Sequence, residues 1–306
     1  MHDGNESPGA LAALLARGDL VLDGGFATEL EARGHDLRDS LWSARLLRDD
    51  PQAIEDVHAA YFEAGADIAI TASYQATFEG FAERGIEREE AARLLRLSVE
   101  LARRARARTG GIGLVAGSVG PYCVVWANGA EYTGDYTGAT DDQIATTQRA
   151  RIVELAAAGA DVIALETIPN GREAVVVGEL LAELPQVEAW VSFCCRDGAH
   201  LSDGTSIEDA IRAAGRTGRV AAFGINCTPP EHIASLLEAA RRVTDVPLLV
   251  YPNGGRAWDE ATYTWSGIGV DHFPAGLIER WRALGARGIG GCCGIGPTAI
   301  AELARA

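Results

Sequence analysis

The sequence predicts a single-domain (β/α)8 barrel, the TIM-barrel fold, and three observations support this fold class. The chain has 306 residues, a length that α/β barrels often reach as one unit. Hydrophobic residues make up 47% of the chain and charged residues 23%, which is normal for a globular protein with a substantial core. Short apolar runs alternate with helical stretches along the whole chain, as in parallel sheets covered by helices.

A recurring module places three of the predicted strands. Each copy has the end of a helix, then a glycine that suits a helix C-cap, then a short apolar strand. The copies are "YFEAGADIAITAS" (61–73), "LAAAGADVIALET" (155–167) and "WRALGARGIGGCC" (281–293). Seven residues beyond each capping glycine stand, in order, Ala72, Glu166 and Cys292.

Further apolar runs bring the predicted strands to eight. They are "DLVLDGG" (19–25), "GLVAGSVG" (113–120), "EAWVSFCC" (188–195), "AAFGINC" (221–227) and "PLLVYPN" (247–253). Helical stretches such as 87–108 and 232–243 separate them. Eight alternating units favour the barrel, and an open doubly wound sheet is the alternative. No linker-like segment divides the chain, so residues 1–306 are expected to form one domain, with 1–18 as an N-terminal helical extension.

Composition limits the class of partner. The net charge of −16 argues against nucleic acid and anionic membranes, and favours a small-molecule ligand. No apolar run is long enough for a transmembrane helix, and the first residues lack the basic region of a signal peptide. Adjacent rather than framework-spaced cysteines indicate a reducing, cytoplasmic setting. The sequence leaves the oligomeric state open.

Polar residues gather directly after the apolar runs. In a barrel these positions meet at the C-terminal rim, where such enzymes hold their active sites. The residues are Asp23, Ser73, Tyr74, Glu166, Asn226, Cys227, Asn253, Cys292 and Cys293. Two long aromatic loops, 121–138 and 252–273, follow the third and seventh strands. Loops of this length usually carry function.

The cysteines at two strand ends suggest a metal site. Cys227 ends the sixth strand, and Cys292 and Cys293 end the eighth, so only the fold could bring them together. Adjacent side chains on a strand face opposite ways, so both members of the pair can bind one ion only if the strand stops there. The glycines that flank the pair permit such a backbone.

Three thiolates suit Zn²⁺, which prefers four tetrahedral ligands. A fourth protein ligand is not evident, and an open position is typical of catalytic zinc. Zinc deprotonates a bound thiol, so a thiol substrate would become a nucleophile at neutral pH. Two alternatives remain. Free cysteines often simply pack in a core, and the pair Cys194 and Cys195, with Cys123, forms a rival set.

Six motifs in order resemble the homocysteine S-methyltransferase family, over about residues 19–306. They are "DGGFATEL" (23–30), "TASYQATFEG" (71–80), "GSVGPY" (117–122), "GINCTPP" (224–230), "YPNGG" (251–255) and "GGCCG" (290–294). The resemblance implies a zinc-bearing barrel that moves a methyl group from a sulfonium donor to L-homocysteine, forming methionine. The branch that the sequence resembles uses S-methylmethionine, with S-adenosylmethionine as a second donor. Betaine-dependent relatives look more distant.

The resemblance also assigns roles to rim residues. Cys227, Cys292 and Cys293 would hold the catalytic zinc. The substrate-binding residues would be Asp23 and Glu166 for the amino group of homocysteine, Gly24 and Gly25 for its carboxylate, Tyr74 for the sulfur pocket, and Asn226 for orientation. Simpler readings exist for some of these: a turn cap for an aspartate before two glycines, and rim or loop packing for the tyrosine and the asparagine. A glutamate ending an apolar run is harder to explain without a partner.

The methyl donor, a cation, would suit aromatic faces. The candidates in the two long loops are Trp126, Tyr132, Tyr136, Trp258 and Trp265. Two other functional classes stay open at this stage. A thiol-disulfide protein could use Cys292 and Cys293, although no C-x-x-C motif is present. A homocysteine-binding module could instead work with a cobalamin-carrying partner protein.

Overall fold

The computed structural model describes residues 9–37, 42–126, 128–255, 257–259, 264–266 and 269–306, with side chains omitted at 42, 43, 257–259 and 264–266. All eight predicted strands form. They are β1 (Leu20–Val21), β2 (Ile68–Ile70), β3 (Leu114–Val119), β4 (Val162–Ile168), β5 (Ala189–Phe193), β6 (Val220–Asn226), β7 (Leu248–Tyr251) and β10 (Ala286–Ile289). A short hairpin of β8 (Ala257–Asp259) and β9 (Thr264–Ser266) lies in the second long loop.

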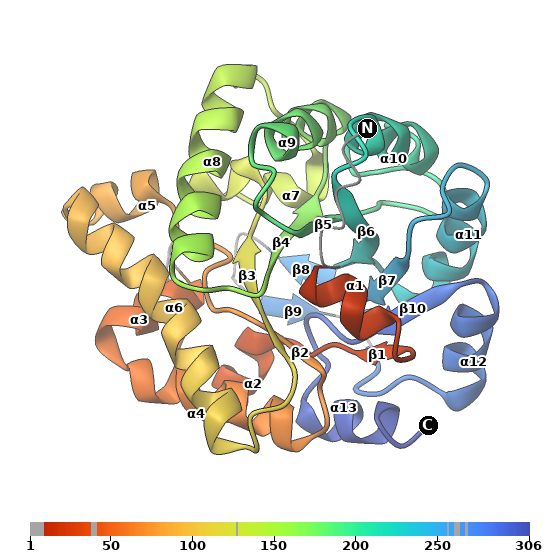
Figure 1. Cartoon of the computed structure of the whole chain (residues 1–306), viewed down its shortest axis with the longest axis horizontal. Helices are drawn as coiled ribbons and strands as arrows, with labels where there is room; N and C mark the ends of the chain where they lie inside the picture. The colour runs from red at the N-terminus through yellow and green to blue at the C-terminus, as the bar shows by residue number, and fades with distance from the viewer. Residues whose placement is uncertain (1–8, 38–41, 127, 256, 260–263, 267–268) are drawn as a thin grey trace, which may run out of the picture.

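The eight strands are parallel and form one sheet in the order β1-β10-β7-β6-β5-β4-β3-β2. The sheet returns on itself, because Leu22 and Ile68 form a parallel bridge and the Asp23 N–H donates to the Ile68 carbonyl at 3.0 Å. Helices surround the strands (Figure 1). The predicted (β/α)8 barrel is therefore confirmed, and the open doubly wound sheet is not formed.

Helices follow the strands in the expected alternation. They are α1 (Ala10–Leu15), α2 (Phe26–Ala32), α3 (Leu46–Asp49), α4 (Pro51–Glu63), α5 (Phe78–Glu83), α6 (Arg88–Arg108), α7 (Ala130–Thr133), α8 (Asp141–Ala157), α9 (Gly171–Glu183), α10 (Ile207–Gly215), α11 (Pro230–Arg241), α12 (Ala275–Ala283) and α13 (Pro297–Leu303). Two 3-10 turns are η1 (Trp42–Arg45) and η2 (Tyr122–Val125). None of the helices in the described part of the chain is long and apolar enough to cross a membrane.

The glycines of the recurring module end helices as predicted. Gly65, Gly159 and Gly285 have φ values of 98°, 86° and 97°, in the left-handed region that glycine adopts without strain. After the first of these, the Ala66 N–H donates back to the Tyr61 carbonyl at 3.1 Å. This bond closes the helix end and turns the chain into β2.

The helix α1 closes one end of the barrel. Leu11 and Leu15 are buried in the same apolar layer as Leu22 and Trp190 of the barrel interior. The Glu188 carboxylate accepts the N–H groups of Leu11 and Ala12, at 2.9 and 3.1 Å, and so fixes the start of this helix. Figure 1 shows α1 lying across the strands. The strand ends that carry the polar residues lie at the other end of the barrel.

Candidate metal and substrate site

Three thiols that are far apart in sequence meet at the C-terminal rim. The Sγ atoms of Cys227, Cys292 and Cys293 all lie within 4.8 Å of one another, and the last two are 4.0 Å apart. In the described part of the chain, no other group of three His, Cys, Asp or Glu side chains is arranged to hold a metal ion. Tetrahedral ligands at about 2.3 Å from zinc would place sulfurs roughly 3.8 Å apart, so the thiols fit that ion with little movement.

The cysteine pair can point to one centre because the strand has already ended. β10 stops at Ile289, before the pair. The N–H of Cys292 donates to the Pro252 carbonyl at 2.8 Å, and the N–H of Ile295 donates to the Cys292 carbonyl at 3.1 Å. This tight turn replaces the alternating geometry of a strand, so Cys292 and Cys293 do not face opposite ways.

The glycines before the pair are required by close contacts. A Cβ on Gly290 would lie 2.7 Å from the Asp23 carbonyl oxygen, and one on Gly291 would lie 2.3 Å from the Ile295 side chain. Real Cβ atoms do not approach other atoms this closely, so a larger residue would move the turn. The turn therefore packs directly against the segment after β1.

Cys227 lies in an unusual backbone conformation. Its φ is 47°, and that of Thr167 at the end of β4 is 62°, values that cost roughly 1–3 kcal/mol for non-glycine residues. The side chain of Asn226 supports both. Its Oδ1 accepts from the Thr167 N–H at 2.9 Å and from Ser192 Oγ at 2.7 Å, and its Nδ2 donates to Thr167 Oγ1 at 2.7 Å. Asn226 thus holds the backbone beside Cys227, and its side chain forms its hydrogen bonds with Thr167 and Ser192.

The pKa values of the three thiols are shifted in different directions, lowered for Cys292 and raised for Cys227 and Cys293. The pKa of Cys292 is lowered well below its ordinary value, because the side chains of Cys227 and Cys293 hydrogen-bond to its sulfur. The pKa of Cys227 is raised, chiefly by the same hydrogen bond with Cys292. Thiols lose their protons when they bind a metal ion, so a metal bound by all three would release protons.

Two buried carboxylates lie next to the thiols. Burial raises the pKa of Asp23 well above its usual range, with a further contribution from Glu166, and burial raises the pKa of Glu166 to about 7. Asp23 Oδ2 accepts the Ile70 N–H at 2.7 Å, while Ser118 and Tyr251 donate to Glu166. Two neighbouring carboxylates in a desolvated site favour a cation between them.

The two glycines after Asp23 let the chain approach the cysteine turn. A Cβ on Gly24 would lie 2.3 Å from the Ile295 carbonyl oxygen, and one on Gly25 would lie 2.6 Å from that of Cys292. The Gly25 N–H donates to the Ile295 carbonyl at 2.8 Å. The family resemblance implies that the Gly25 N–H donates to the substrate carboxylate. In the structure this N–H already donates to the cysteine turn.

Tyr74 lies between the β2 end and Cys227. Its ring packs against Gly120, where a Cβ would be 3.0 Å from the ring. The pKa of Tyr74 is raised, mainly by burial, with a contribution from the charge of Cys227, and its hydroxyl is hydrogen-bonded to the Thr167 side chain. These contacts put the ring close to Cys227, where the resemblance to the family implies a sulfur pocket.

The rival cysteines serve the core. Cys123, Cys194 and Cys195 are all buried. Cys194 donates to the Cys227 carbonyl at 3.5 Å, and burial raises its pKa to about 12. The Cys195 N–H donates to Thr228 Oγ1 at 3.0 Å. Among the described residues these three cysteines do not converge as a group that could hold a metal ion, so they pack in the core and support the neighbouring backbone.

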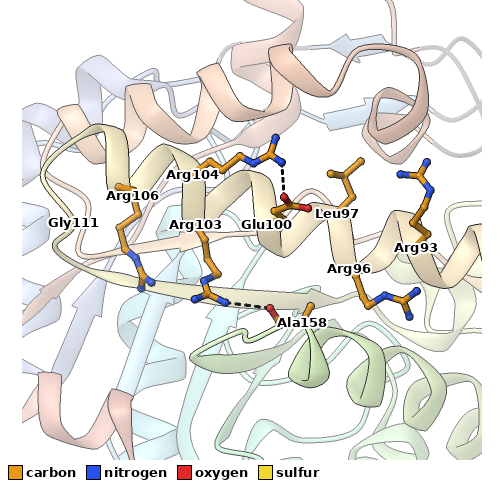
Figure 2. Close-up of a pocket in the computed structure, with 10 residues that line it drawn as sticks. Arg93, Arg96, Leu97, Glu100, Arg103, Arg104, Arg106, Gly111 and Ala158 are labelled. Carbon is orange, nitrogen blue, oxygen red and sulfur yellow. Dashed lines mark hydrogen bonds and ion pairs between the residues drawn. The ribbon is translucent and has the colours of Figure 1, made fainter.

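The Arg-rich helix α6 carries a groove of about 760 Å³ on the outside of the barrel, lined by Arg93, Arg96, Leu97, Glu100, Arg103, Arg104, Arg106, Ala107, Gly111 and Ala158. Figure 2 shows that Arg104 pairs with Glu100 and that Arg103 donates to the Ala158 carbonyl. The other arginines of the groove also pair with carboxylates. The groove is therefore a solvent-facing helix surface in which four of the five arginines pair with carboxylates.

The family assignment follows from the comparison with known proteins. Residues 20–306 match the family model described as homocysteine S-methyltransferase. The chain belongs to the homocysteine S-methyltransferase family. It is 46% identical to the homocysteine S-methyltransferase YbgG of Bacillus subtilis, over 93% of each chain. It is also 46% identical to the homocysteine S-methyltransferase of Escherichia coli, over 96% of this chain and 97% of that protein.

A solved structure of the metallated homocysteine methyltransferase MmuM from Escherichia coli has the same fold. Its TM-score is 0.86 at 44% identity, over 96% of this chain and 99% of that chain. The family resemblance that the six motifs indicated is therefore confirmed over nearly the whole chain.

Several residues that support the site were not predicted from the sequence. Ser118 and Tyr251, which bind Glu166, stand inside the recognised motifs "GSVGPY" and "YPNGG". Their inward-facing positions on β3 and β7 are the signal that could have found them. The buried Arg151 gave no signal, because an arginine on a helix usually faces solvent.

Proposed function

We propose that this protein transfers a methyl group from a sulfonium donor to the thiol of L-homocysteine, forming methionine, with Zn²⁺ held by Cys227, Cys292 and Cys293. The observation that carries the proposal is the placement of three convergent thiols beside two buried carboxylates, Asp23 and Glu166. Homocysteine has a thiol at one end and an ammonium at the other, which match these two features. The activity named for the bacterial relatives supports the same substrate.

Different residues bind the ammonium and the sulfur of homocysteine. Asp23 and Glu166 accept the substrate ammonium, and each is preoriented by groups that donate to it, such as the Ile70 N–H and Ser118 Oγ. Tyr74 covers the sulfur beside Cys227. When bound, zinc supplies the positive charge that keeps the fourth sulfur, that of homocysteine, as a thiolate.

The transfer itself needs no general base from the protein. The thiol proton is lost to solvent as homocysteine binds. The sulfur then forms a bond to the methyl carbon of the donor, and the bond between that carbon and the sulfonium sulfur breaks. Its electron pair stays on the donor sulfur, which leaves as a neutral thioether. Because the donor loses its positive charge, a tight carboxylate contact to the sulfonium would stabilise the ground state more than the transition state.

S-methylmethionine is the proposed first donor and S-adenosylmethionine the second. The test is methionine formation by the purified protein with homocysteine and each of S-methylmethionine, S-adenosylmethionine and betaine. Turnover is expected with the sulfonium donors, and a zinc chelator should abolish it until zinc is returned. We also expect the protein to work in the cytoplasm, because its thiols must stay reduced.

Other outcomes of this assay would overturn the proposal in distinct ways. Turnover with betaine alone would assign a betaine-type methyltransferase. Turnover only after addition of a methylated cobalamin protein would assign the cobalamin-partnered function. Chelator-insensitive thiol oxidation without methionine would assign a thiol-disulfide protein.

A further inference from the structure

The first long loop, residues 121–138, is tied at both ends to one buried carboxylate. Glu173 of α9 is 0% exposed. Its Oε1 accepts the Tyr122 N–H at 2.8 Å near the start of the loop, and its Oε2 accepts the Tyr136 hydroxyl near the end. Gln148 Nε2 donates to the same carboxylate at 2.6 Å. These hydrogen bonds form what we call the Glu173 clamp.

The clamp continues to the end of β2 through a buried arginine. Arg151 of α8 is 0% exposed, and its guanidinium donates to the carbonyls of Gly120, at 2.7 Å, and Tyr74. It also donates to Gln148 Oε1 at 3.2 Å, which connects it to Glu173. A buried polar network whose members are hydrogen-bonded to one another can fix one conformation.

Two further hydrogen bonds hold the short helix α7 in the middle of the loop. Asn170 Nδ2 donates to the Gly134 carbonyl at 2.9 Å, and Ser202 Oγ donates to the Glu131 carbonyl at 2.9 Å. These donors come from the segments that follow β4 and β5. The loop is therefore anchored by three neighbouring parts of the rim, and Tyr132 stands between the two anchored carbonyls.

The anchor on Ser202 also places α7 next to the thiols. The Ser202 N–H donates to the Cys194 carbonyl at 3.3 Å, and Cys194 Sγ in turn donates to the Cys227 carbonyl at 3.5 Å. The pKa of Tyr132 is raised by burial and then by the charges of Cys293 and Cys227. The hydrogen bonds through Ser202 and Cys194 therefore place Tyr132, which follows Glu131, on the loop side of the rim near Cys227.

The other aromatic side chains of this loop are used elsewhere. Tyr122, Trp126 and Tyr136 pack against one another, with ring centroids 5.4 to 6.1 Å apart. The Tyr136 hydroxyl also donates a hydrogen bond to Glu173. Their rings build the core of the loop. The two candidates in the second long loop are Trp258 and Trp265, and the structure does not describe their side chains.

We propose that Tyr132 forms one fixed wall of the sulfonium-donor site, and that the Glu173 clamp is the device that positions it. The inference rests on the proposed function. An aromatic face attracts a cation without a full counter-charge, so the donor can lose its charge during transfer at little cost. A preformed wall avoids the cost of ordering the loop each time the donor binds.

Tyr136→Phe tests the clamp, because it removes one hydrogen bond to Glu173 and keeps the ring. We expect the KM for the sulfonium donor to rise about tenfold, as the loop spends less time in the binding conformation. The KM for homocysteine and the zinc content should not change. Hydrogen exchange of residues 121–138 should become faster.

Tyr122→Phe is the matched control. It removes a hydroxyl from the same aromatic group, and that hydroxyl has no hydrogen-bond partner among the described residues. Donor KM and exchange rates should stay at wild-type values. Tyr132→Leu tests the wall directly. It should raise donor KM about tenfold without changing exchange of the loop, because the clamp is intact.

Three results would overturn the inference. Tyr136→Phe could match Tyr122→Phe in both readouts, Tyr136→Phe could raise both KM values equally, or Tyr132→Leu could leave donor KM unchanged. Wild-type protein that used no sulfonium donor would instead reject the proposed function. Exchange rates in Tyr136→Phe would still test the clamp in that case, since they need no turnover, and unchanged rates would reject it.

Discussion

Replacing Cys227, Cys292 or Cys293 by serine should in each case empty the metal site and abolish methyl transfer. Each substitution removes one of three convergent sulfurs, and a neutral hydroxyl is a poor substitute for a thiolate on zinc. The loss should exceed the roughly 10- to 100-fold effect typical of residues that only support a metal ligand. Zinc per chain and turnover are the quantities to measure.

The barrel should remain folded in all three variants, because its core consists of apolar layers that do not contain these thiols. Circular dichroism would verify this. Cys194→Ser is the control, since that side chain is 2% exposed, close to Cys227, and outside the metal group. Its zinc content should equal that of the wild type. Full zinc in all three variants, or loss of zinc in the control, would show that the ligands are assigned wrongly.

Asp23→Asn and Glu166→Gln should mainly weaken homocysteine binding. Each change keeps the shape of the side chain and removes one charge-assisted hydrogen bond to the substrate ammonium. The expected cost is on the order of 1.5–3 kcal/mol, or roughly tenfold to a hundredfold in affinity. Calorimetric titration of zinc-loaded protein with homocysteine would measure it, and the zinc content should not change.

Glu188→Gln is a suitable control for these carboxylate variants. Glu188 lies at the opposite end of the barrel, where it binds the start of α1, so its loss should leave homocysteine affinity unchanged. Unaltered affinity in both Asp23→Asn and Glu166→Gln would mean that the substrate ammonium is held by other groups.

The fold was predictable because local signals repeat along the chain. A glycine that suits a helix C-cap, followed by a short apolar run, occurs three times, and each copy forms a helix, a left-handed cap and a strand. The cysteine pair was recognisable for a similar reason. Cys292 and Cys293 could serve one centre only where a strand ends among glycines, and β10 ends at Ile289.

The supporting groups were not predictable, since they depend on pairings between distant segments. Arg151 and Glu173 are charged residues on helices, a pattern that usually indicates a solvated face, yet both are 0% exposed. Only the packing of α8 and α9 against the loop after β3 explains them. The use of the Gly25 N–H by the Ile295 carbonyl likewise depends on two turns meeting in space.

The central claim is that homocysteine binds as a thiolate at the site of the three cysteines. The direct measurement is the number of protons released when homocysteine binds zinc-loaded protein, from calorimetry at pH 7 in buffers of different ionisation enthalpy. A free thiol has a pKa of about 8.5, so binding as thiolate should release nearly one proton per site. Release close to zero would contradict the account, because it would mean that homocysteine binds as a neutral thiol away from the metal.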